Sequence, residues 1–231
     1  MMRIDGLQKM TLLDFPGKVA CTVFTGGCNF RCPFCHNALL VTELPQKPDY
    51  TVDEILGFLK KRQGLLDGVA ITGGEPLMNP DIDSFIKEIR KLGYSVKLDT
   101  NGSFPERLEK IVNDGLADYV AMDIKNCKEK YAETVGLSSF DLSKVERSVD
   151  FLKNGPVDYE FRTTVVREFH TVDDIRKAAE WISGAKRYFL QNFVDSGNLI
   201  DPSVGGVDKK TMFRMKDAAA DFVPQTEIRG I

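Results

Sequence analysis

Short apolar runs rich in β-branched and aromatic residues alternate along the chain with longer segments in which apolar residues recur every three or four positions. The short runs predict strands, and the longer segments predict amphipathic helices. Because the two kinds alternate, the pattern favours parallel strands joined by helices. The predicted strands are residues 18–26, 68–72, 94–100, 118–124, 157–166 and 187–193.

The helical segments begin and end at recognisable capping residues. Thr51, followed three positions later by Glu54, predicts a capping box in which each side chain satisfies a free backbone N–H of the first turn. Asn79 and Pro80 predict the cap and first residue of a second helix, which ends at Gly93. Further helices, each followed by a glycine, are predicted at residues 105–113, 142–153 and 173–183.

The six β/α units follow one another without a break and predict a single domain over residues 1–231. Six units are too few for the eight of a closed TIM barrel. We therefore expect an α/β fold, a partial and open-sided (β/α)6 TIM-like barrel, with a flat doubly wound sheet as the alternative. Residues 41–50 and 194–207 have the composition of loops, and the second is a candidate mobile lid.

The 31 basic and 34 acidic residues are intermixed along the chain and give a formal net charge of −3. No basic block predicts a nucleic-acid surface. The first residues lack the pattern of a secretion signal, and no run of about 18 apolar residues predicts a membrane span. We therefore expect a cytoplasmic protein whose partners are neither nucleic acids nor membranes.

Three of the five cysteines, Cys28, Cys32 and Cys35, form a C-x3-C-x2-C motif directly after the first predicted strand. An odd number of cysteines in a chain with no export signal is typical of metal binding or chemistry rather than of disulfides. Structural zinc requires four ligands, and the three cysteines have no fourth nearby except His36. Because His36 directly follows Cys35, coordination of one ion by both is geometrically awkward. The other cysteines and histidine, which lie elsewhere in the sequence, are Cys21, Cys127 and His170.

Three thiolates are better suited to a [4Fe-4S] cluster in which one iron lacks a protein ligand and stays open to a small molecule. Open coordination indicates catalysis. A non-catalytic zinc or iron-sulfur module for a partner is the alternative. Cys21 and Cys127 are too few for a second cluster, and we expect both to be buried thiols.

Polar motifs recur at the ends of the predicted strands. Because the carboxyl ends of parallel strands meet at one edge, these motifs predict one shared pocket. Gly73 and Gly74 let the backbone approach a ligand closely, and Glu75 can accept hydrogen bonds from an ammonium group. The motifs are "TGGEP" (72–76), "LDTNG" (98–102), "MDIK" (122–125) and "FRTT" (161–164).

The cysteine motif, with the aromatic Phe34 just before its last cysteine, resembles the cluster loop of the radical S-adenosylmethionine enzymes. The resemblance implies that the open iron chelates the amino and carboxylate groups of S-adenosylmethionine. An electron from the cluster then cleaves this molecule to methionine and a 5′-deoxyadenosyl radical. By the same resemblance, the segment Gly73, Gly74 and Glu75 binds the amino group.

A narrower resemblance is to the activating enzymes of glycyl radical enzymes, and among them to activating proteins of anaerobic ribonucleoside-triphosphate reductases. It is carried by "DFPG" (14–17), "GCNFRCPFCHN" (27–37), "GGEP", "LDTNG" and "MDIK". It implies abstraction of a hydrogen atom from a backbone glycine of a partner enzyme, with a flavodoxin or ferredoxin as electron donor. The alternatives are an activator of a pyruvate formate-lyase-like enzyme, or a radical enzyme acting on a small molecule such as a modified nucleobase precursor.

The resemblance also assigns site residues. Asp99, Asp123 and Lys125 correspond to positions near the methionine end of S-adenosylmethionine, and some family members hold a monovalent cation beside the two aspartates. Asp14 corresponds to a residue facing the glycine loop, so Asp14 and Lys125 join the cysteines as catalytic candidates. The other cofactor-binding candidates are Thr100, Asn101, Arg162 and Gln191. Relatives of the pyruvate formate-lyase branch have a histidine near Gln191, which this chain lacks.

Overall fold

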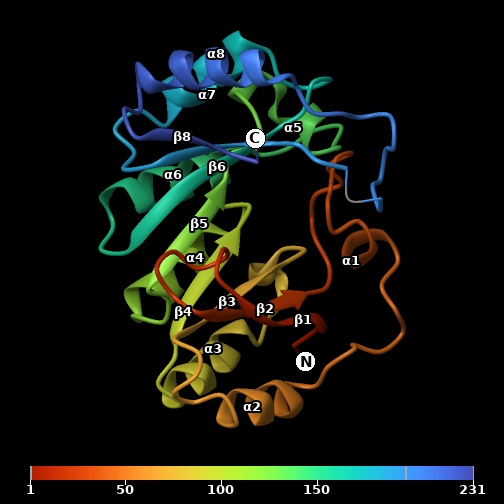
Figure 1. The fold of residues 1–231 in the computed structure, drawn as a ribbon, viewed down its shortest axis with the longest axis vertical. Coiled ribbons are helices and arrows are strands. Elements are labelled where there is room, and N and C mark those ends of the chain that lie inside the picture. Colours follow the sequence, from red (N-terminus) through yellow and green to blue (C-terminus); the bar gives the residue numbers. More distant parts are fainter. Residues whose placement is uncertain (1, 196, 231) are drawn as a thin grey trace.

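The computed structural model describes residues 2–195 and 197–230, and among these the strands form one eight-stranded sheet in the order of the sequence (Figure 1). β1 pairs antiparallel with β2, and every later neighbouring pair is parallel. The strands are β1 (Ile4–Thr11), β2 (Ala20–Thr25), β3 (Gly68–Gly73), β4 (Ser95–Thr100), β5 (Tyr119–Asp123), β6 (Asp158–Val165), β7 (Tyr188–Asn192) and β8 (Thr226–Arg229).

The longer helices cover the outer face of this curved sheet, whereas the short α1 (Leu39–Thr42) lies on the side of the open interior (Figure 1). A doubly wound sheet would reverse its strand order at a switch point, whereas here the order never reverses and β1 does not pair with β8. The open-barrel prediction is therefore confirmed. The helices are α1 (Leu39–Thr42), α2 (Val52–Lys60), α3 (Ile82–Lys91), α4 (Pro105–Asn113), α5 (Tyr131–Thr134), α6 (Ser143–Asn154), α7 (Val172–Trp181) and α8 (Lys209–Ala220), with short 3-10 turns η1 (Pro76–Met78) and η2 (Lys128–Lys130).

The predicted strands correspond to β2–β7, and the predicted capping box of Thr51 and Glu54 is present at the start of α2. The predicted start of the second helix at Asn79 and Pro80 is wrong, because α3 begins at Ile82. The Asn79 side chain instead accepts a hydrogen bond from the backbone N–H of Arg3 at 3.0 Å. β1, β8 and α8 were not predicted.

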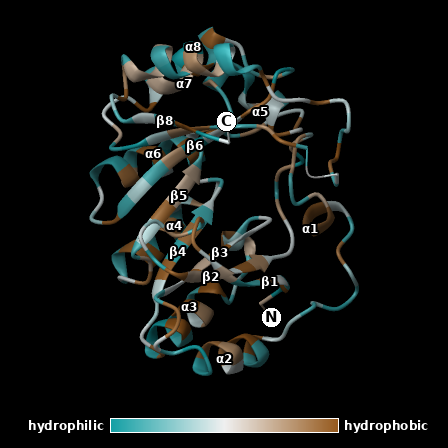
Figure 2. Ribbon diagram, in the orientation of Figure 1, coloured by the Kyte–Doolittle hydropathy of each residue, from teal (hydrophilic) through white to brown (hydrophobic). Residues whose placement is uncertain are grey.

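Alternation along the strands separates an apolar outer layer from a charged interior. Every second residue of β4 and β6 faces the helices, and these residues, Val96, Leu98, Tyr159 and Phe161, are buried. α3 supplies the matching apolar stripe through Ile82, Phe85, Ile86 and Ile89. Figure 2 shows the strands banded in brown, white and teal, in keeping with this alternation of apolar and polar residues. The opposite faces of the strands carry charged side chains into the barrel.

Two segments expected to be loops are largely irregular in the structure. After α1, residues 43–49 form no helix or strand, and Tyr50 makes an isolated bridge with Ile4. The described residues of 194–207 also form no helix or strand, while Ser196 of this stretch lies outside the described residues. A lid at 194–207 stays a prediction. Within the described residues, no helix has both the length and the apolar character needed to cross a membrane.

Candidate active site

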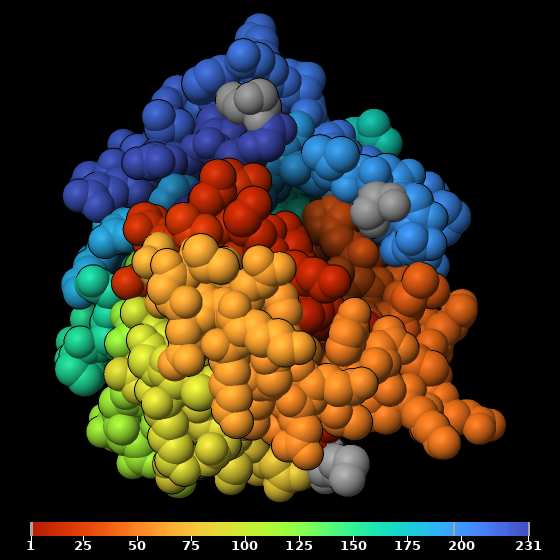
Figure 3. Space-filling view, turned by 60° about the horizontal axis from the view of Figure 1, so that its bottom comes forward, coloured from red at the N-terminus to blue at the C-terminus, as the bar shows by residue number. Residues whose placement is uncertain are grey.

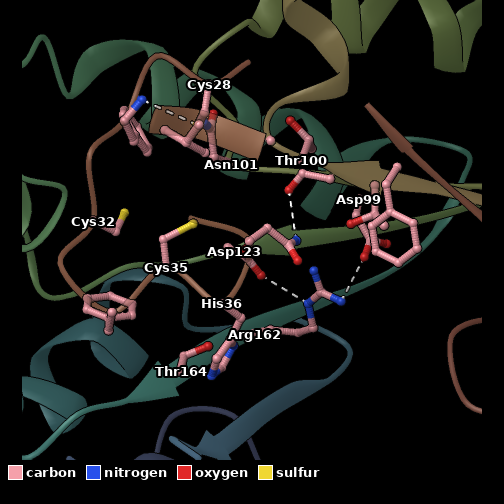
Figure 4. Close-up of a pocket in the computed structure, with 18 of the residues that line it drawn as sticks. Cys28, Cys32, Cys35, His36, Asp99, Thr100, Asn101, Asp123, Arg162 and Thr164 are labelled. Atoms are coloured by element: carbon pink, nitrogen blue, oxygen red, sulfur yellow. Dashed lines mark hydrogen bonds and ion pairs between the residues drawn. The ribbon is translucent and has the colours of Figure 1, made fainter. Parts of the chain in front are cut away.

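A cavity of about 380 Å³ lies at the carboxyl ends of the central strands (Figure 4). The cluster loop, residues 27–37, forms one wall, and β1, β2 and the ends of β3–β7 contribute to the others. The candidates from the sequence that line it are Asp14, Cys28, Cys32, Phe34, Cys35, Gly73, Gly74, Asp99, Thr100, Asn101, Asp123, Lys125, Arg162 and Gln191. The strand-end motifs therefore do meet in one pocket, as expected.

The cluster loop is held in place by backbone hydrogen bonds to distant segments. The N–H of Gly27 donates to Leu40, and its carbonyl oxygen accepts from the N–H of Glu75, each at 2.8 Å. The N–H of Arg31 donates to the carbonyl oxygen of Val135 at 2.9 Å. The loop is thus clamped between the end of β3 and the residue after α5.

The glycines of the "GGE" segment have a packing role that the sequence did not indicate. A Cβ atom on Gly74 would lie 2.0 Å from the carbonyl oxygen of Gly27, and one on Gly73 would lie 2.3 Å from that of Thr25. Such distances are impossible for a side chain, so only glycine lets β3 approach β2 and the cluster loop this closely. Both glycines also line the cavity. The same two residues therefore allow the close approach of the chain segments and leave their backbone open to a ligand.

The cysteine thiols fit the ligand set of an iron-sulfur cluster. Cys28, Cys32 and Cys35 are all free of disulfides and all line the same cavity. Burial raises the pKa of the Cys28 thiol to about 12, and the charge of Glu75 adds to this effect. Burial likewise raises the pKa of Cys32 to about 11, although the Lys125 charge opposes it. The thiols are therefore protonated without a metal, and ligation would release their protons.

The described residues contain no group of three or more histidine, cysteine, aspartate or glutamate side chains arranged to hold a single metal ion. Cys21 and Cys127 do not line the cavity and are buried, as expected. The Cys127 sulfur instead lies 3.7 Å from the Oδ1 atom of Asp174. The thiols at the cavity are thus the three of the predicted motif.

Glu75 does not line the cavity, because its fully buried carboxylate faces the end of β4. It accepts hydrogen bonds from the Thr100 hydroxyl at 2.8 Å, the Asn101 N–H at 2.7 Å and the Leu77 N–H at 3.0 Å. Burial raises the pKa of Glu75 to about 7, although these bonds oppose the shift. In this geometry the carboxylate fixes the "LDTNG" segment against the "GGE" segment, and within the latter Gly73 and Gly74, not Glu75, line the cavity.

An alternating row of charges crosses the barrel interior along the cavity, and Figure 4 shows its middle members Asp99, Arg162 and Asp123. Arg162 donates to Asp99 at 3.1 Å and to Asp123 at 3.0 Å. Lys97 pairs with the far side of Asp99, and Lys125 donates to Asp123 at 2.9 Å. Three cations thus accompany two carboxylates. The excess positive charge is suited to binding an anionic group in the cavity.

Burial raises the pKa of Asp123, but Arg162 and Lys125 outweigh it and bring the pKa down to about 2. The pKa of Asp99 is lowered in the same way by Arg162 and Lys97 against the effect of burial. Both carboxylates are therefore ionised at neutral pH. The Arg162 guanidinium already supplies a positive charge between Asp99 and Asp123. The resemblance places a monovalent cation beside the same two aspartates.

Asp14, from the segment after β1, and Gln191, from β7, both line the cavity. The Asp14 carboxylate accepts a hydrogen bond from the Thr22 hydroxyl at 2.5 Å. Phe34 is buried, with its ring centroid 5.7 Å from that of Phe169. Lining residues that were not singled out include Gln8, whose strand β1 was not predicted, and Thr164, whose motif "FRTT" was noted.

His36 also lines the cavity, and its ring stacks on Phe193 with centroids 5.1 Å apart. Its Nε2 atom lies 2.9 Å from the carbonyl oxygen of Val194. The sequence marked His36 as an awkward candidate for a zinc ligand and as part of the "GCNFRCPFCHN" motif. The structure places it against the residues that directly follow β7.

Comparison with known proteins adds family information to this geometry. The model of the radical SAM superfamily matches residues 22–186. A protein of Methanocaldococcus jannaschii named "Putative glycyl-radical enzyme activating enzyme" is 32% identical over 197 residues, which cover 82% of this chain and 79% of that protein. The pyruvate formate-lyase-activating enzyme of Clostridium pasteurianum is 32% identical over 131 residues, which cover 54% of this chain and 53% of that protein.

Among solved structures, Streptococcus suis SuiB bound to S-adenosylmethionine superposes with a TM-score of 0.68 at 14% sequence identity. The match covers 88% of this chain and 48% of SuiB, so the chain spans about half the length of that protein. At this identity the likeness concerns the fold. The shared fold agrees with the open barrel described above.

Proposed function

Because the chain belongs to the radical SAM superfamily, whose members use a [4Fe-4S] cluster and S-adenosylmethionine, we propose that it generates a glycyl radical on a partner enzyme. The proposed partner is an anaerobic ribonucleoside-triphosphate reductase, with a flavodoxin or ferredoxin as electron donor. The observation that carries the proposal is that the strand-end motifs shared with activating enzymes line one cavity together with the three cysteines.

Cys28, Cys32 and Cys35 would hold the cluster at the wall of the cavity. Once bound, the cluster would supply the electron for cleavage of S-adenosylmethionine to methionine and a deoxyadenosyl radical, and transfer of a hydrogen atom from a glycine Cα to that radical would give 5′-deoxyadenosine and a glycyl radical. Lys125, at the end of the charge row, would bind the carboxylate of the methionine part. The backbone of Gly73 and Gly74 would face the amino group.

The rim of the cavity supports a protein as the substrate. Three large aliphatic side chains at the end of β1 are exposed, with Met10 63%, Leu12 68% and Leu13 90% accessible. The next residue, Asp14, lines the cavity. Clustered exposed aliphatic residues are typical of a protein contact surface. In Figure 3 the N-terminal residues, in red, lie at the surface between the dark blue C-terminal residues and the orange segment near residue 60.

The test is an anaerobic reaction of the reconstituted protein with S-adenosylmethionine, a reductant and a candidate reductase. We expect a glycyl doublet in the electron paramagnetic resonance spectrum of the reductase and release of 5′-deoxyadenosine. The Cys32→Ala variant should lose both signals, whereas Cys127→Ala, which removes a buried thiol away from the cavity, should keep them. Equal activity of Cys32→Ala and the wild type would contradict the cluster assignment.

The same assay separates the other candidate substrates. The 32% identity to a pyruvate formate-lyase-activating enzyme favours a second candidate, activation of a pyruvate formate-lyase-like protein. A doublet on that protein and none on the reductase would select it. Release of 5′-deoxyadenosine with a small nucleobase precursor, and no doublet on either protein, would contradict both activating roles.

A further inference from the structure

Asn101, two residues beyond Asp99, is the centre of a buried hydrogen-bond network next to Cys28. Its side-chain Oδ1 atom accepts from the backbone N–H of Ser103 at 2.9 Å and from the Ser103 hydroxyl at 2.6 Å. Because a backbone N–H can only donate, the oxygen of the Asn101 amide must face Ser103. The amide nitrogen therefore faces the opposite direction.

The two hydrogens of the Asn101 amide have two acceptors in that direction. The Nδ2 atom lies 3.0 Å from the Oδ1 atom of Asn29 and 3.9 Å from the Cys28 sulfur. Asn29 in turn donates to the Ser103 hydroxyl at 2.9 Å, which closes the network. Figure 4 shows Asn101 and Cys28 together at one end of the cavity. Asn101 is 5% exposed, so water does not compete for these hydrogens.

The backbone of Asn101 is fixed as firmly as its side chain. Its N–H donates to the buried Glu75 carboxylate at 2.7 Å. The Cys28 sulfur has a second donor, the backbone N–H of Phe30 at 3.3 Å. Cys28 thus lies against one local backbone donor and one side-chain amide that comes from the residue directly after β4.

We infer that Asn101 is a positioning residue that sets the reduction potential of the cluster through its amide contact with the Cys28 sulfur. This rests on the ligation proposed above but not on the identity of the substrate. A ligating thiolate is a stronger acceptor than a thiol. Adding an electron makes the sulfurs more negative, so a fixed N–H donor stabilises the reduced form and raises the potential.

The inference predicts a measurable shift when the donor is removed. Asn101→Leu and Asn101→Ser both remove the amide, the first at nearly the same volume, while the backbone bond to Glu75 is kept. We expect the ratio of reduced to oxidised cluster at a given potential to fall at least threefold, which is about 28 mV toward negative values for a one-electron couple. Asn29→Ala is the matched control, because it breaks the same network but leaves the Asn101 amide against Cys28 through Ser103.

The measurement is a potentiometric titration of the anaerobically reconstituted proteins, followed by electron paramagnetic resonance, without S-adenosylmethionine. A negative shift in both Asn101 variants, with the Asn29→Ala potential unchanged, supports the inference. An unchanged or more positive potential in the Asn101 variants overturns it, as does an equal shift in Asn29→Ala. If neither Asn101 variant binds four irons while Asn29→Ala does, Asn101 serves loop assembly instead, and the inference is also overturned. Absence of a cluster in the wild type would instead contradict the ligation proposal.

Discussion

Replacing Arg162 by methionine removes the guanidinium that joins Asp99 to Asp123 inside the barrel. Each of the two carboxylates then keeps only one lysine as a partner. Less positive charge remains to offset the cost of burying them. Removing one partner from a buried ionic network typically costs 3–5 kcal/mol. Because Lys97 and Lys125 remain paired, we expect a smaller loss of about 2–3 kcal/mol in the free energy of unfolding.

The pKa of Asp123 gives an independent value for the contribution of these ion pairs to stability. Its fall to about 2 is worth about 2 kcal/mol of stability. A carboxylate whose pKa is depressed by folding contributes this stability above its unfolded pKa and loses it as the pH falls through the folded value. The difference in the free energy of unfolding between wild type and Arg162→Met should therefore be largest near pH 7 and shrink as the pH falls toward about 2.

Guanidinium unfolding followed by circular dichroism, near pH 7 and at a series of lower pH values, measures both effects. Arg147→Met is the matched control, because Arg147 also joins two carboxylates, Glu106 at 2.5 Å and Glu109 at 2.7 Å. Its side chain is 49% exposed, whereas that of Arg162 is 14% exposed. An exposed network is screened by water, so Arg147→Met should cost much less. Equal losses in the two variants, or a difference independent of pH, would refute the reasoning.

Three further changes test other parts of the site. Lys125→Met should weaken S-adenosylmethionine binding about 10- to 100-fold by calorimetry, since a charge-assisted hydrogen bond is lost, whereas Lys128→Met, on an exposed ion pair, should not. Gly74→Ala should lower the iron bound after reconstitution, because its Cβ would displace the cluster loop, whereas Gly57→Ala in α2 meets no atom within 4 Å and should bind iron normally. Glu75→Gln should lower the free energy of unfolding by about 1–3 kcal/mol in denaturant titrations, because an amide NH2 would face buried donors; unchanged stability would contradict this.

The central strands could be predicted because each is a short run rich in β-branched and aromatic residues, and β4 and β6 also alternate apolar with polar positions. The edge strands lack this signal. β1 has three consecutive exposed residues in its second half, Lys9 and Met10 among them, and β8 is only four residues long. Their pairing is determined by the neighbouring strands β2 and β7 rather than by their own composition. Because β1 was not predicted, its residue Gln8 was not expected at the cavity.

The site could be predicted as a set of motifs but not as a set of contacts. The topology of the sheet brings the strand ends that carry "GGE", "LDTNG" and "MDIK" to one pocket, independently of the orientation of each side chain. Which way Glu75 points depends on donors supplied by Thr100 and Asn101 after the strands pair. A buried carboxylate takes the donors that compensate its burial. The local sequence contains no information about these partners, so Glu75 was expected in the cavity, whereas it is buried outside the cavity lining.

His36 shows why comparison by strand position alone misses part of the site. The end of β7 carries Gln191 where the resemblance expects a histidine, yet an imidazole is present there. His36 comes from the cluster loop, one residue after Cys35, and stacks on Phe193 with an interplanar angle of 6°. Because the carbonyl oxygen of Val194 can only accept, the Nε2 atom of His36 carries a proton. Burial lowers the pKa of His36, so the ring is neutral near pH 7. The loop that carries the cysteines thus supplies to the end of β7 an imidazole that the strand itself lacks.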